Sequence, residues 1–399
     1  MSSRNFRSST LHGFILITAL IVSVAFSNQL ASAHALSASY TTVTFDKDKT
    51  DFSFSLDVIS ILESMDVDTN GDGILQEDEL ERNKHKLEEW IGDSVVLEMN
   101  GSEQAGELLG IRLDQKSDKE VVTWHYAYPA FEPGQTVSIL DGLYSQTTSS
   151  PYVNLITAHN GSQVSETVLQ GKSRTWTMLL TEDQQQQQLT SSSNSSNPQT
   201  QSPSSPNDGS STMSTTSDWF SFFKLGMNHI LTGYDHLLFL FALLLRKQKL
   251  KQYISIITAF TLAHSITLTL AVLGWISLPS RLVESAIALS ICYVALENIF
   301  RKEIRFRWVV TFLFGLIHGI GFSGILRGMN LPKTHLAVDL ISFNLGIECI
   351  QLGIVLLLLP ILIYFQKKSF FKPTVTYGSW IITTLGAVWL VQRLFGLLI

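Results

Sequence analysis

The chain has 399 residues, a net charge of −6 and an isoelectric point near 5.9. This acidic balance, without any cluster of Lys and Arg interleaved with aromatic residues, argues against nucleic acid as a partner. The two cysteines, Cys292 and Cys349, both fall in apolar stretches, which excludes a disulfide framework and a CxxC metal or redox motif. Because the apolar residues gather after residue 218, length and composition together indicate two or three units.

The first 33 residues have the pattern of a secretory signal peptide. Arg4 and Arg7 precede an apolar core from Gly13 to Phe26, and Ala31-Ser32-Ala33 offers small residues at a cleavage site. A retained first membrane helix is the alternative, but this apolar core is short for a bilayer span. We therefore predict that residues 1–33 are removed and that the domain that follows them is exported.

Residues 34–181 are predicted to form a mainly-β sandwich. The segment contains short runs rich in Val, Thr, Tyr, Phe and Trp with alternating apolar residues, which is the pattern of strands with one buried face. Several short strands at such spacing are typical of an antiparallel sandwich, and we expect a soluble extracytoplasmic domain. The runs are Ser39 to Phe45, Asp51 to Val58, Val95 to Met99, Glu120 to Pro129, Thr136 to Leu140, Tyr152 to Ala158, Val164 to Leu169 and Thr175 to Thr181.

One segment inserted in this domain, Asp68 to Glu79, matches the calcium loop of an EF-hand along its whole length. Ca²⁺ takes roughly six to eight oxygen ligands, which the EF-hand loop supplies from fixed positions, with a glycine in the middle for the turn. Gly73 occupies that glycine position. The predicted calcium ligands are the side chains of Asp68, Asn70, Asp72, Gln76 (directly or through a water) and Glu79, and the backbone carbonyl of Ile74.

The loop is flanked as an EF-hand requires, although it stands alone. Glu77 to Trp90 is predicted as the exiting helix and Ile59 to Met65 as a short entering segment. Because EF-hands usually work in pairs and the sequence contains no second loop, we expect weak binding suited to millimolar extracellular calcium. An Asp/Gly-rich turn that binds no ion is the alternative.

Residues 182–218 are predicted to be a disordered linker. They contain Gln184 to Gln188 and are otherwise rich in Ser, Thr, Asn and Pro. Such a segment lacks the apolar residues whose burial offsets the entropy cost of ordering. The units on its two sides therefore need no fixed relative geometry.

Residues 219–399 are predicted to form an all-α bundle of six transmembrane helices. Six apolar segments are each long enough to cross a bilayer, which takes roughly 20 residues. Gly315, Gly319, Gly321 and Gly324 make the fourth segment a close-packing surface and a candidate break point. The six segments are Trp219 to Leu245, Gln252 to Leu273, Arg281 to Phe300, Trp308 to Leu326, Leu336 to Phe365 and Tyr377 to Leu398.

The loop charges predict the orientation of this bundle in the cell membrane. The first, third and fifth loops are rich in Lys and Arg, for example Arg246 to Lys251 and Arg301 to Arg307. Because positively charged loops stay in the cytoplasm, residues 34–218 and the C-terminus are predicted to be extracytoplasmic. The signal peptide independently predicts the same placement of residues 34–218.

The first predicted span carries three ionisable side chains, His229, Asp235 and His236. A seven-residue step falls about 20° short of two helical turns, so both imidazoles of one continuous helix would lie on one face. Ionisable groups are costly in hydrocarbon and by default mark an ion path or a catalytic centre. Asp235 is predicted either as a metal ligand or as the hydrogen-bond partner that fixes a histidine's tautomer.

Further polar side chains lie at a similar depth in other spans. His264 lies in the second and His318 in the fourth, while Asn344, Glu348 and Gln351 share one face of the fifth. Imidazole and carboxylate ligands together suit Ni²⁺, Co²⁺, Zn²⁺ or Cu²⁺ better than Mg²⁺ or Ca²⁺. For any one histidine, a hydrogen bond to a neighbouring helix is the alternative explanation.

The order of these motifs resembles the HupE/UreJ family of membrane proteins over residues 219–398. This resemblance implies a six-helix nickel or cobalt permease. Two features depart from the family: Ile230 stands where a proline often follows the first histidine, and the short permeases lack the large secreted domain. The motifs are His229-x5-Asp235-His236-Leu237-Leu238, Thr261-Leu262-Ala263-His264-Ser265, Phe314-Gly315-Leu316-Ile317-His318-Gly319 and Phe343-Asn344-Leu345-Gly346-Ile347-Glu348.

The sequence supports three hypotheses of function. The leading hypothesis is a transporter, not an enzyme, which moves a divalent transition metal through a midplane site made by His229, Asp235, His236, His264, His318, Asn344 and Glu348. The competing hypothesis is an intramembrane hydrolase that activates water on Zn²⁺ with the same cluster, assisted by Ser265 and Glu297. A receptor anchored by its membrane half is a third. The sandwich domain is expected to be a sensor, a scavenger or a docking module for an extracytoplasmic protein that the sequence does not identify.

Overall fold

The computed structural model of the chain describes residues 37–117, 119–144, 152–161, 163–181, 218–301, 306–329, 333–366 and 371–395. These residues form two compact units. The sandwich unit is made mainly by Ser37–Ser221, and the helical unit by Phe222–Gly328 with Ala337–Ile399. The predicted signal peptide and, except for Asp218, the predicted linker lie outside the described residues.

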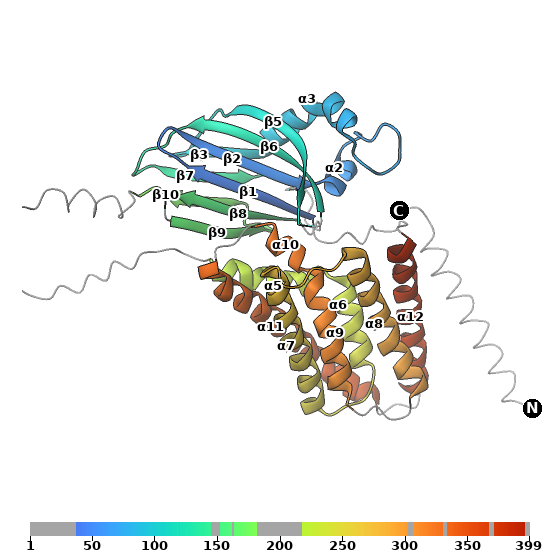
Figure 1. Cartoon of the computed structure of the whole chain (residues 1–399). Helices are drawn as coiled ribbons and strands as arrows, with labels where there is room; N and C mark the ends of the chain where they lie inside the picture. Colours follow the sequence, from blue (N-terminus) through green and yellow to red (C-terminus); the bar gives the residue numbers. More distant parts are fainter. Residues whose placement is uncertain are drawn as a thin grey trace, which may run out of the picture. The chain divides into compact units, whose positions relative to one another are not determined.

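The sandwich unit contains two sheets, as the alternating runs predicted (Figure 1). The larger has the strand order β5-β6-β2-β1-β8-β9 and the smaller the order β10-β7-β3-β4. All eight predicted strands are present, with ends shifted by two residues or fewer. The strands are β1 Ser37–Phe45, β2 Lys49–Asp57, β3 Val95–Met99, β4 Ser102–Glu103, β5 Glu107–Lys116, β6 Lys119–Pro129, β7 Thr136–Asp141, β8 Tyr152–Asn160, β9 Gln163–Gln170 and β10 Thr175–Leu179.

The prediction of a purely antiparallel sandwich is wrong for one strand pair. β1 and β8 run parallel, from Ser37 opposite Tyr152 to Phe45 opposite Asn160, while the other pairs of named strands are antiparallel. A parallel pair needs a long crossover, and here the crossover contains β2 to β7. Alternation in the sequence identifies a strand but not its partner, so this pairing was not predictable.

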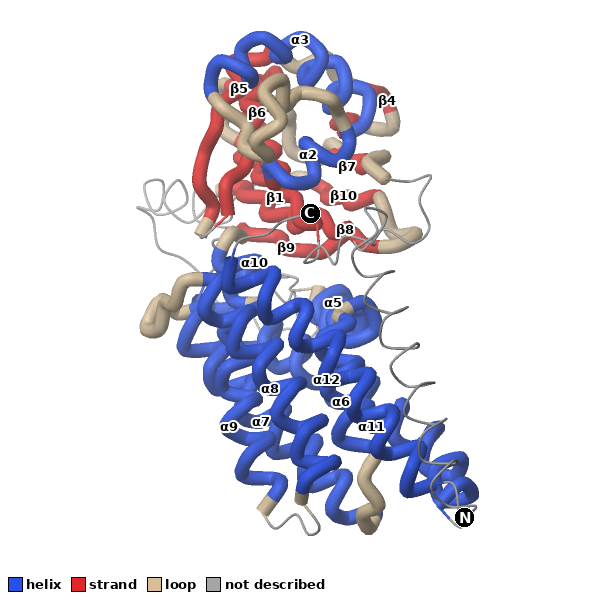
Figure 2. The backbone as a smooth tube through the Cα atoms, turned by 90° about the vertical axis from the view of Figure 1, so that its right-hand side faces the viewer, coloured by secondary structure: helices blue, strands red, loops and turns tan. Residues whose placement is uncertain are grey.

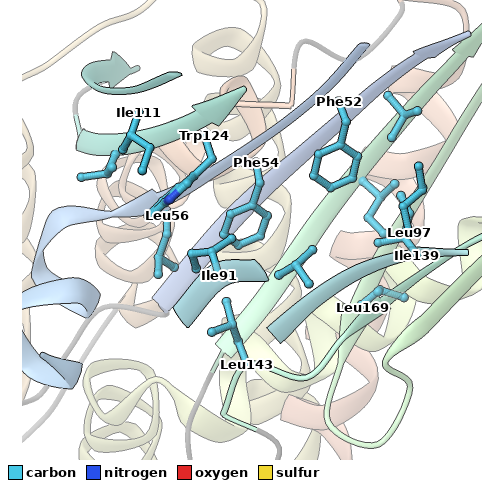
Figure 3. Close-up of a cluster of buried hydrophobic side chains, with 14 of the residues drawn as sticks. Phe52, Phe54, Leu56, Ile91, Leu97, Ile111, Trp124, Ile139, Leu143 and Leu169 are labelled. Atoms are coloured by element: carbon cyan, nitrogen blue, oxygen red, sulfur yellow. The ribbon is translucent and has the colours of Figure 1, made fainter. Parts of the chain in front are cut away.

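The core of the unit lies between the two sheets, as Figure 3 shows. Phe54 and Trp124 are fully buried from neighbouring strands of the larger sheet, with ring centroids 5.9 Å apart. Leu97 and Ile139 contribute from the smaller sheet. Two strands were not predicted: β4 has only two residues, and the alternation of β5 is interrupted at Gly110, which lies at a register shift.

Two helices lie at one end of the strands and flank the predicted calcium loop (Figure 1). The first, α2 (Val58–Ser64), begins at Asp57, whose side chain accepts a hydrogen bond from the Ser60 N–H. The second, α3 (Glu77–Ser94), begins with a capping box between Gln76 and Glu79. Both predicted flanking segments are therefore helical, and α3 runs four residues beyond its predicted end.

Five helices of the helical unit are long and apolar enough to cross a membrane, counted over the described residues. In Figures 1 and 2 most of the helices run alongside one another. These five spans are Leu250–Val272, Ser280–Phe300, Arg307–Arg327, His335–Gln366 and Pro373–Phe395. The helices are α5 Trp219–Thr232, α6 Tyr234–Leu244, α7 Leu250–Val272, α8 Ser280–Phe300, α9 Arg307–Gly321, α10 Ser323–Arg327, α11 Lys333–Gln366 and α12 Phe371–Phe395.

The first and fourth predicted spans are each broken in two. The first breaks at Gly233, between α5 and α6, and the fourth at Phe322, between α9 and α10. Glycine is a poor helix former, and a ψ of 96° takes Gly233 out of the helical range. The prediction of one continuous first helix is therefore wrong, and a sixth crossing stays a prediction.

Two glycines of the fourth span, Gly315 and Gly319, pack closely on α7, as the sequence predicted. A Cβ added to Gly315 would meet the carbonyl oxygen of Phe260 and the side chain of Ala263, and one added to Gly319 would overlap the carbonyl oxygen of His264. Small residues let helix backbones approach in this way. The close approach fixes α9, which carries His318, directly against the part of α7 that carries His264.

Candidate metal sites

The break at Gly233 brings the two histidines of the first span together. In one straight helix a seven-residue step separates residues by about 10.5 Å along the axis. In the structure the rings of His229 and His236 lie 4.5 Å apart, centroid to centroid. A Cβ on Gly233 would lie 2.9 Å from His236 Nδ1 and 2.7 Å from the His229 carbonyl oxygen, so this approach requires glycine. The two imidazoles meet, but through a broken helix and not through a shared helical face.

One group of three metal-ligating side chains occurs among the described residues, formed by His229, His236 and His264. Their candidate ligand atoms all lie within 4.8 Å of one another. His236 and His264 are buried, and His264 is fully so. The Nε2 atom of each of the three rings is buried without a hydrogen-bond partner in the part of the chain that the structure describes. Such unpaired polar atoms are expensive in an apolar bundle unless a ligand satisfies them.

Hydrogen bonds at the opposite ring nitrogen orient these imidazoles. His236 Nδ1 lies 3.0 Å from Asp235 Oδ1, and His264 Nδ1 lies 3.3 Å from Asn344 Oδ1. A carboxylate can only accept, so the Nδ1 of His236 carries the proton and its Nε2 keeps a lone pair. Asn344 donates through Nδ2 to the Leu340 carbonyl at 2.7 Å, which turns its oxygen toward His264. Both histidines therefore present a basic Nε2, the form that binds a metal.

His318 joins the cluster from α9. Its ring centroid lies 5.3 Å from that of His236, and its Nδ1 donates to the carbonyl of Phe314 at 2.8 Å. Its Nε2 is also buried without a hydrogen-bond partner among the described residues. The four histidines named in the sequence thus come together, with His318 as a fourth imidazole beside the group of three.

The remaining predicted residues of the site take other places. Asp235 and Asn344 contact histidines through Nδ1 and not through Nε2. The Glu348 carboxylate accepts a hydrogen bond from Thr258 at 3.0 Å. Thr258 precedes His264 by six residues, or about 9 Å along α7. Glu348 is therefore not brought into the group of three, and its part in binding stays a prediction.

The two residues named as assistants of a hydrolase are engaged elsewhere. The Ser265 hydroxyl donates to the carbonyl of Thr261 at 2.7 Å, within its own helix. Glu297 forms ion pairs with Arg301 at 3.2 Å and with Arg307 at 3.9 Å, near the start of α9. Neither is placed beside the histidine cluster by any of these contacts.

Chemically, the cluster suits a borderline transition metal. Neutral imidazoles bind Ni²⁺, Co²⁺, Zn²⁺ or Cu²⁺, whereas Mg²⁺ and Ca²⁺ prefer oxygen ligands. The hydrogen bonds at Nδ1 of His236, His264 and His318 raise the basicity of each ligand and fix its direction. The arrangement can therefore hold one such ion by Nε2 atoms, with Asp235 compensating charge from behind His236.

The predicted calcium loop turns at two glycines and is held by hydrogen bonds to its own carboxylates. Gly71 and Gly73 both have positive φ angles, 75° and 76°, which glycine adopts without strain. Asp68 accepts hydrogen bonds from the N–H groups of these two glycines at 2.7 and 2.8 Å. Asp72 accepts from the Ile74 N–H at 2.9 Å. The loop therefore wraps its backbone around the carboxylates at its start.

Glu79 closes the loop from α3. It accepts hydrogen bonds from the N–H of Gln76 at 3.2 Å and from the N–H and hydroxyl of Thr69 at 2.8 Å each. The Gln76 bond and then the Thr69 hydroxyl hold the pKa of the Glu79 carboxyl below its ordinary value. The carboxylates of this loop do not form a group of three as close as that of the histidines.

Two features of the histidine site were not predicted. The break at Gly233 changes how the ligands meet, and Phe322, at the second break, packs on His229 with ring centroids 4.4 Å apart. The signal for the first was present in the sequence, because a glycine between two histidines of an apolar helix is a candidate break point. The glycine-rich segment from Gly315 to Gly324 does predict the second break, but it does not predict the contact of Phe322 with His229.

The family match covers most of the helical unit. Residues 207–393 match the sequence model of a family described as HupE / UreJ protein. None of the curated proteins compared with the chain matches it. Membership of this family implies a role in nickel or cobalt transport, and the family is one of transporters rather than enzymes. With several helices able to cross a membrane and this match, the chain is a multi-pass membrane protein that carries a HupE/UreJ domain over residues 207–393.

Proposed function

We propose that this protein transports a divalent transition metal, Ni²⁺ or Co²⁺, through a site formed by the Nε2 atoms of His229, His236, His264 and His318. The observation that carries the proposal is that one ring nitrogen from each of His229, His236 and His264 lies within 4.8 Å of the others, while the Nε2 atom of each ring has no hydrogen-bond partner among the described residues. Asp235 and Asn344 act in this proposal as orienting partners of His236 and His264. Zn²⁺ is the next candidate ion because it accepts the same ligands.

The broken helices support transport over catalysis. In many secondary transporters the substrate and ion sites lie where membrane helices are discontinuous. Here α5 and α6 break beside His229, and α9 and α10 break four residues after His318. A break of this kind lets a short helix move without bending a long one. An intramembrane zinc hydrolase remains the competing outcome of the experiments below, because three imidazoles and an open position also activate water.

We propose that the loop from Asp68 to Glu79 binds one Ca²⁺ ion on the extracytoplasmic side. The proposal is supported by the ligand order in the sequence and by the turn geometry at Gly71 and Gly73. Residues 34–181 also carry 24 acidic against 10 basic residues, which favours cations near this unit. Calcium would then fix α2 and α3 at the end of the sandwich.

The first prediction concerns the histidines. His229→Ala or His236→Ala should abolish accumulation of radiolabelled Ni²⁺ or Co²⁺ in proteoliposomes, because each removes one of three converging ligands. Folding should persist, since an imidazole that lines a site adds little packing. His335→Ala, in the first turn of α11, is the control and should be nearly silent. Wild-type protein that moves no divalent metal but retains zinc lost in His236→Ala would favour the hydrolase.

The second prediction separates ligation from orientation at Asp235. If its carboxylate orients His236, Asp235→Asn should weaken metal binding by roughly 10- to 100-fold, because an amide oxygen can still accept from Nδ1. Asn344→Leu removes the corresponding acceptor from His264 and should have an effect of similar size. Calorimetric titration of the purified protein with Ni²⁺ measures both. Complete loss of binding in Asp235→Asn would instead identify a direct ligand.

The third prediction concerns calcium. Glu79→Gln should weaken Ca²⁺ binding by at least about tenfold, because it removes the bidentate carboxylate of the loop. Glu77→Gln, an exposed change two residues earlier on α3, is the matched control. Calorimetry on the full chain at millimolar Ca²⁺ gives the readout. The proposal fails if the unmodified protein produces no calcium-dependent heat.

The fourth prediction concerns orientation. We propose that residues 34–218 and the C-terminus are extracytoplasmic, as the loop charges and the signal sequence indicate together. A cysteine introduced at Ser192, with Cys292 and Cys349 changed to Ser, should react with a membrane-impermeant thiol reagent in intact cells. Labelling only after lysis would reverse the proposed orientation.

A further inference from the structure

The first helix pair of the helical unit has a second copy in the sequence. Shifting the chain by 89 residues aligns residues 223–237 with 312–326. The shift superimposes Phe223 on Phe312, Gly226 on Gly315, His229 on His318 and Leu237 on Leu326. It also superimposes the two helix breaks, at Gly233 and Phe322. One glycine, one histidine and one break thus recur at the same spacing in both segments.

The helix that follows each pair is also repeated. Phe260-Thr261-Leu262-Ala263 on α7 aligns with Phe343-Asn344-Leu345-Gly346 on α11 after a shift of 83 residues. Phenylalanine and leucine are identical, and a small residue closes each segment. The two shifts differ by six residues, which is absorbed in the connection between the broken helix and the next one. Each half of the unit therefore has a broken helix, a helix with this motif and a third helix, α8 or α12.

The contacts in the structure repeat with the sequence. A Cβ added to Gly226 would overlap the carbonyl oxygen of Phe343, and a Cβ added to Gly315 would meet that of Phe260. Likewise the ring of His229 lies 5.6 Å from the ring of Phe343, and that of His318 lies 5.0 Å from that of Phe260. Because the pairs 226/315, 229/318 and 343/260 are those the alignment predicts, each contact has its counterpart between the other two helices.

The two halves face in opposite directions. Three helices that run alongside one another, α6, α7 and α8, lie between the break at Gly233 and the start of α9 (Figure 1). Because the chain reverses direction at each connection, the break at Gly233 and the start of α9 lie at opposite ends of the bundle. Gly226 precedes His229 by three residues and Gly315 precedes His318 by three, so the two glycine contacts lie on opposite sides of the histidine cluster.

We infer that residues 219–300 and 307–395 are two inverted repeats, and that the α5–α11 contact at Gly226 and the α7–α9 contact at Gly315 are the two gates of the metal site. Inverted repeats let a transporter open to each side by exchanging the conformations of its halves. The ion lies between repeat-related His229 and His318, and one gate separates it from each side. The cargo in this inference rests on the proposed function, but the repeat and the gates do not.

Glycine substitutions test the gates one at a time. Gly226→Ala and Gly315→Ala each force a methyl group against a backbone carbonyl, which should loosen one contact and favour the state open at that end. The reporter is Thr261→Cys, a buried position one turn from His264, in a full chain whose Cys292 and Cys349 are serine. A membrane-impermeant thiol reagent is applied to either face of sealed vesicles, and the labelling rate is measured.

The two variants should change labelling from opposite faces. We expect Gly226→Ala to raise the rate about tenfold from the face where α5 begins, and Gly315→Ala to raise it about tenfold from the other face. Gly353→Ala is the control, because an added Cβ there meets nothing within 4 Å, and it should leave both rates unchanged. Increases from the same face, from both faces equally, or none at all would overturn the assignment of the gates.

Substitute variants and a separate metal-uptake measurement distinguish failure of the gates from failure of the proposed cargo. If a variant fails to fold, Gly346→Ala replaces Gly226→Ala, because an added Cβ there overlaps the Phe223 carbonyl oxygen in the same α5–α11 contact. Likewise Gly319→Ala replaces Gly315→Ala, because its added Cβ overlaps the His264 carbonyl oxygen in the same α7–α9 contact. Labelling requires no metal movement. A protein that gates in this way yet accumulates no Ni²⁺ or Co²⁺ would refute the proposed cargo alone, and one that accumulates metal without face-specific labelling would refute the gates alone.

Discussion

The helical unit contains a set of buried imidazole nitrogens that have no hydrogen-bond partner in the described part of the chain. Burying a polar atom without a partner costs about 1–3 kcal/mol by mutational measures, and His229, His236, His264 and His318 each carry one such Nε2. Three of these rings are fully engaged on the opposite side, through Nδ1. Packing alone does not explain why three rings are oriented through Nδ1 while the Nε2 atom of each has no hydrogen-bond partner among the described residues. An ion that binds imidazole resolves the cost at all four atoms together.

Close backbone approach is what allows this cluster to exist. Rings from four helices, α5, α6, α7 and α9, meet only where backbones come near enough for side chains of this length to converge. Glycines at 226, 233, 315 and 319 remove the Cβ atoms that would prevent this approach. The same glycines leave little side-chain interlock between the helices that they join. Rigid support of the ligands and easy separation of the helices therefore come from one set of residues, which is the combination a binding site for a passing ion requires.

The two units differ in charge and in the metals that their chemistry favours. Residues 34–181 carry 24 acidic and 10 basic residues, and residues 219–399 carry 6 and 16. The carboxylates and carbonyls of the predicted loop suit a hard ion, whereas the imidazoles suit a borderline one. Ca²⁺ in the millimolar range would therefore compete poorly for the histidines, and a scarce transition metal would compete poorly for the loop.

The sequence alone determined the candidate site residues of this protein, and the tertiary structure decided which of them meet and how. Alternation and apolar length identified the strands and the membrane segments, because both follow from local periodicity, and four histidines in apolar helices were conspicuous because hydrocarbon tolerates few ionisable groups. The parallel pairing of β1 with β8, the break at Gly233 and the placing of Glu348 beside Thr258 were beyond local pattern. Each depends on which distant segment packs against which. The first span shows the reason most clearly. The helical period predicted His229 and His236 on one face of a continuous helix, but the break at Gly233 brings their rings together instead.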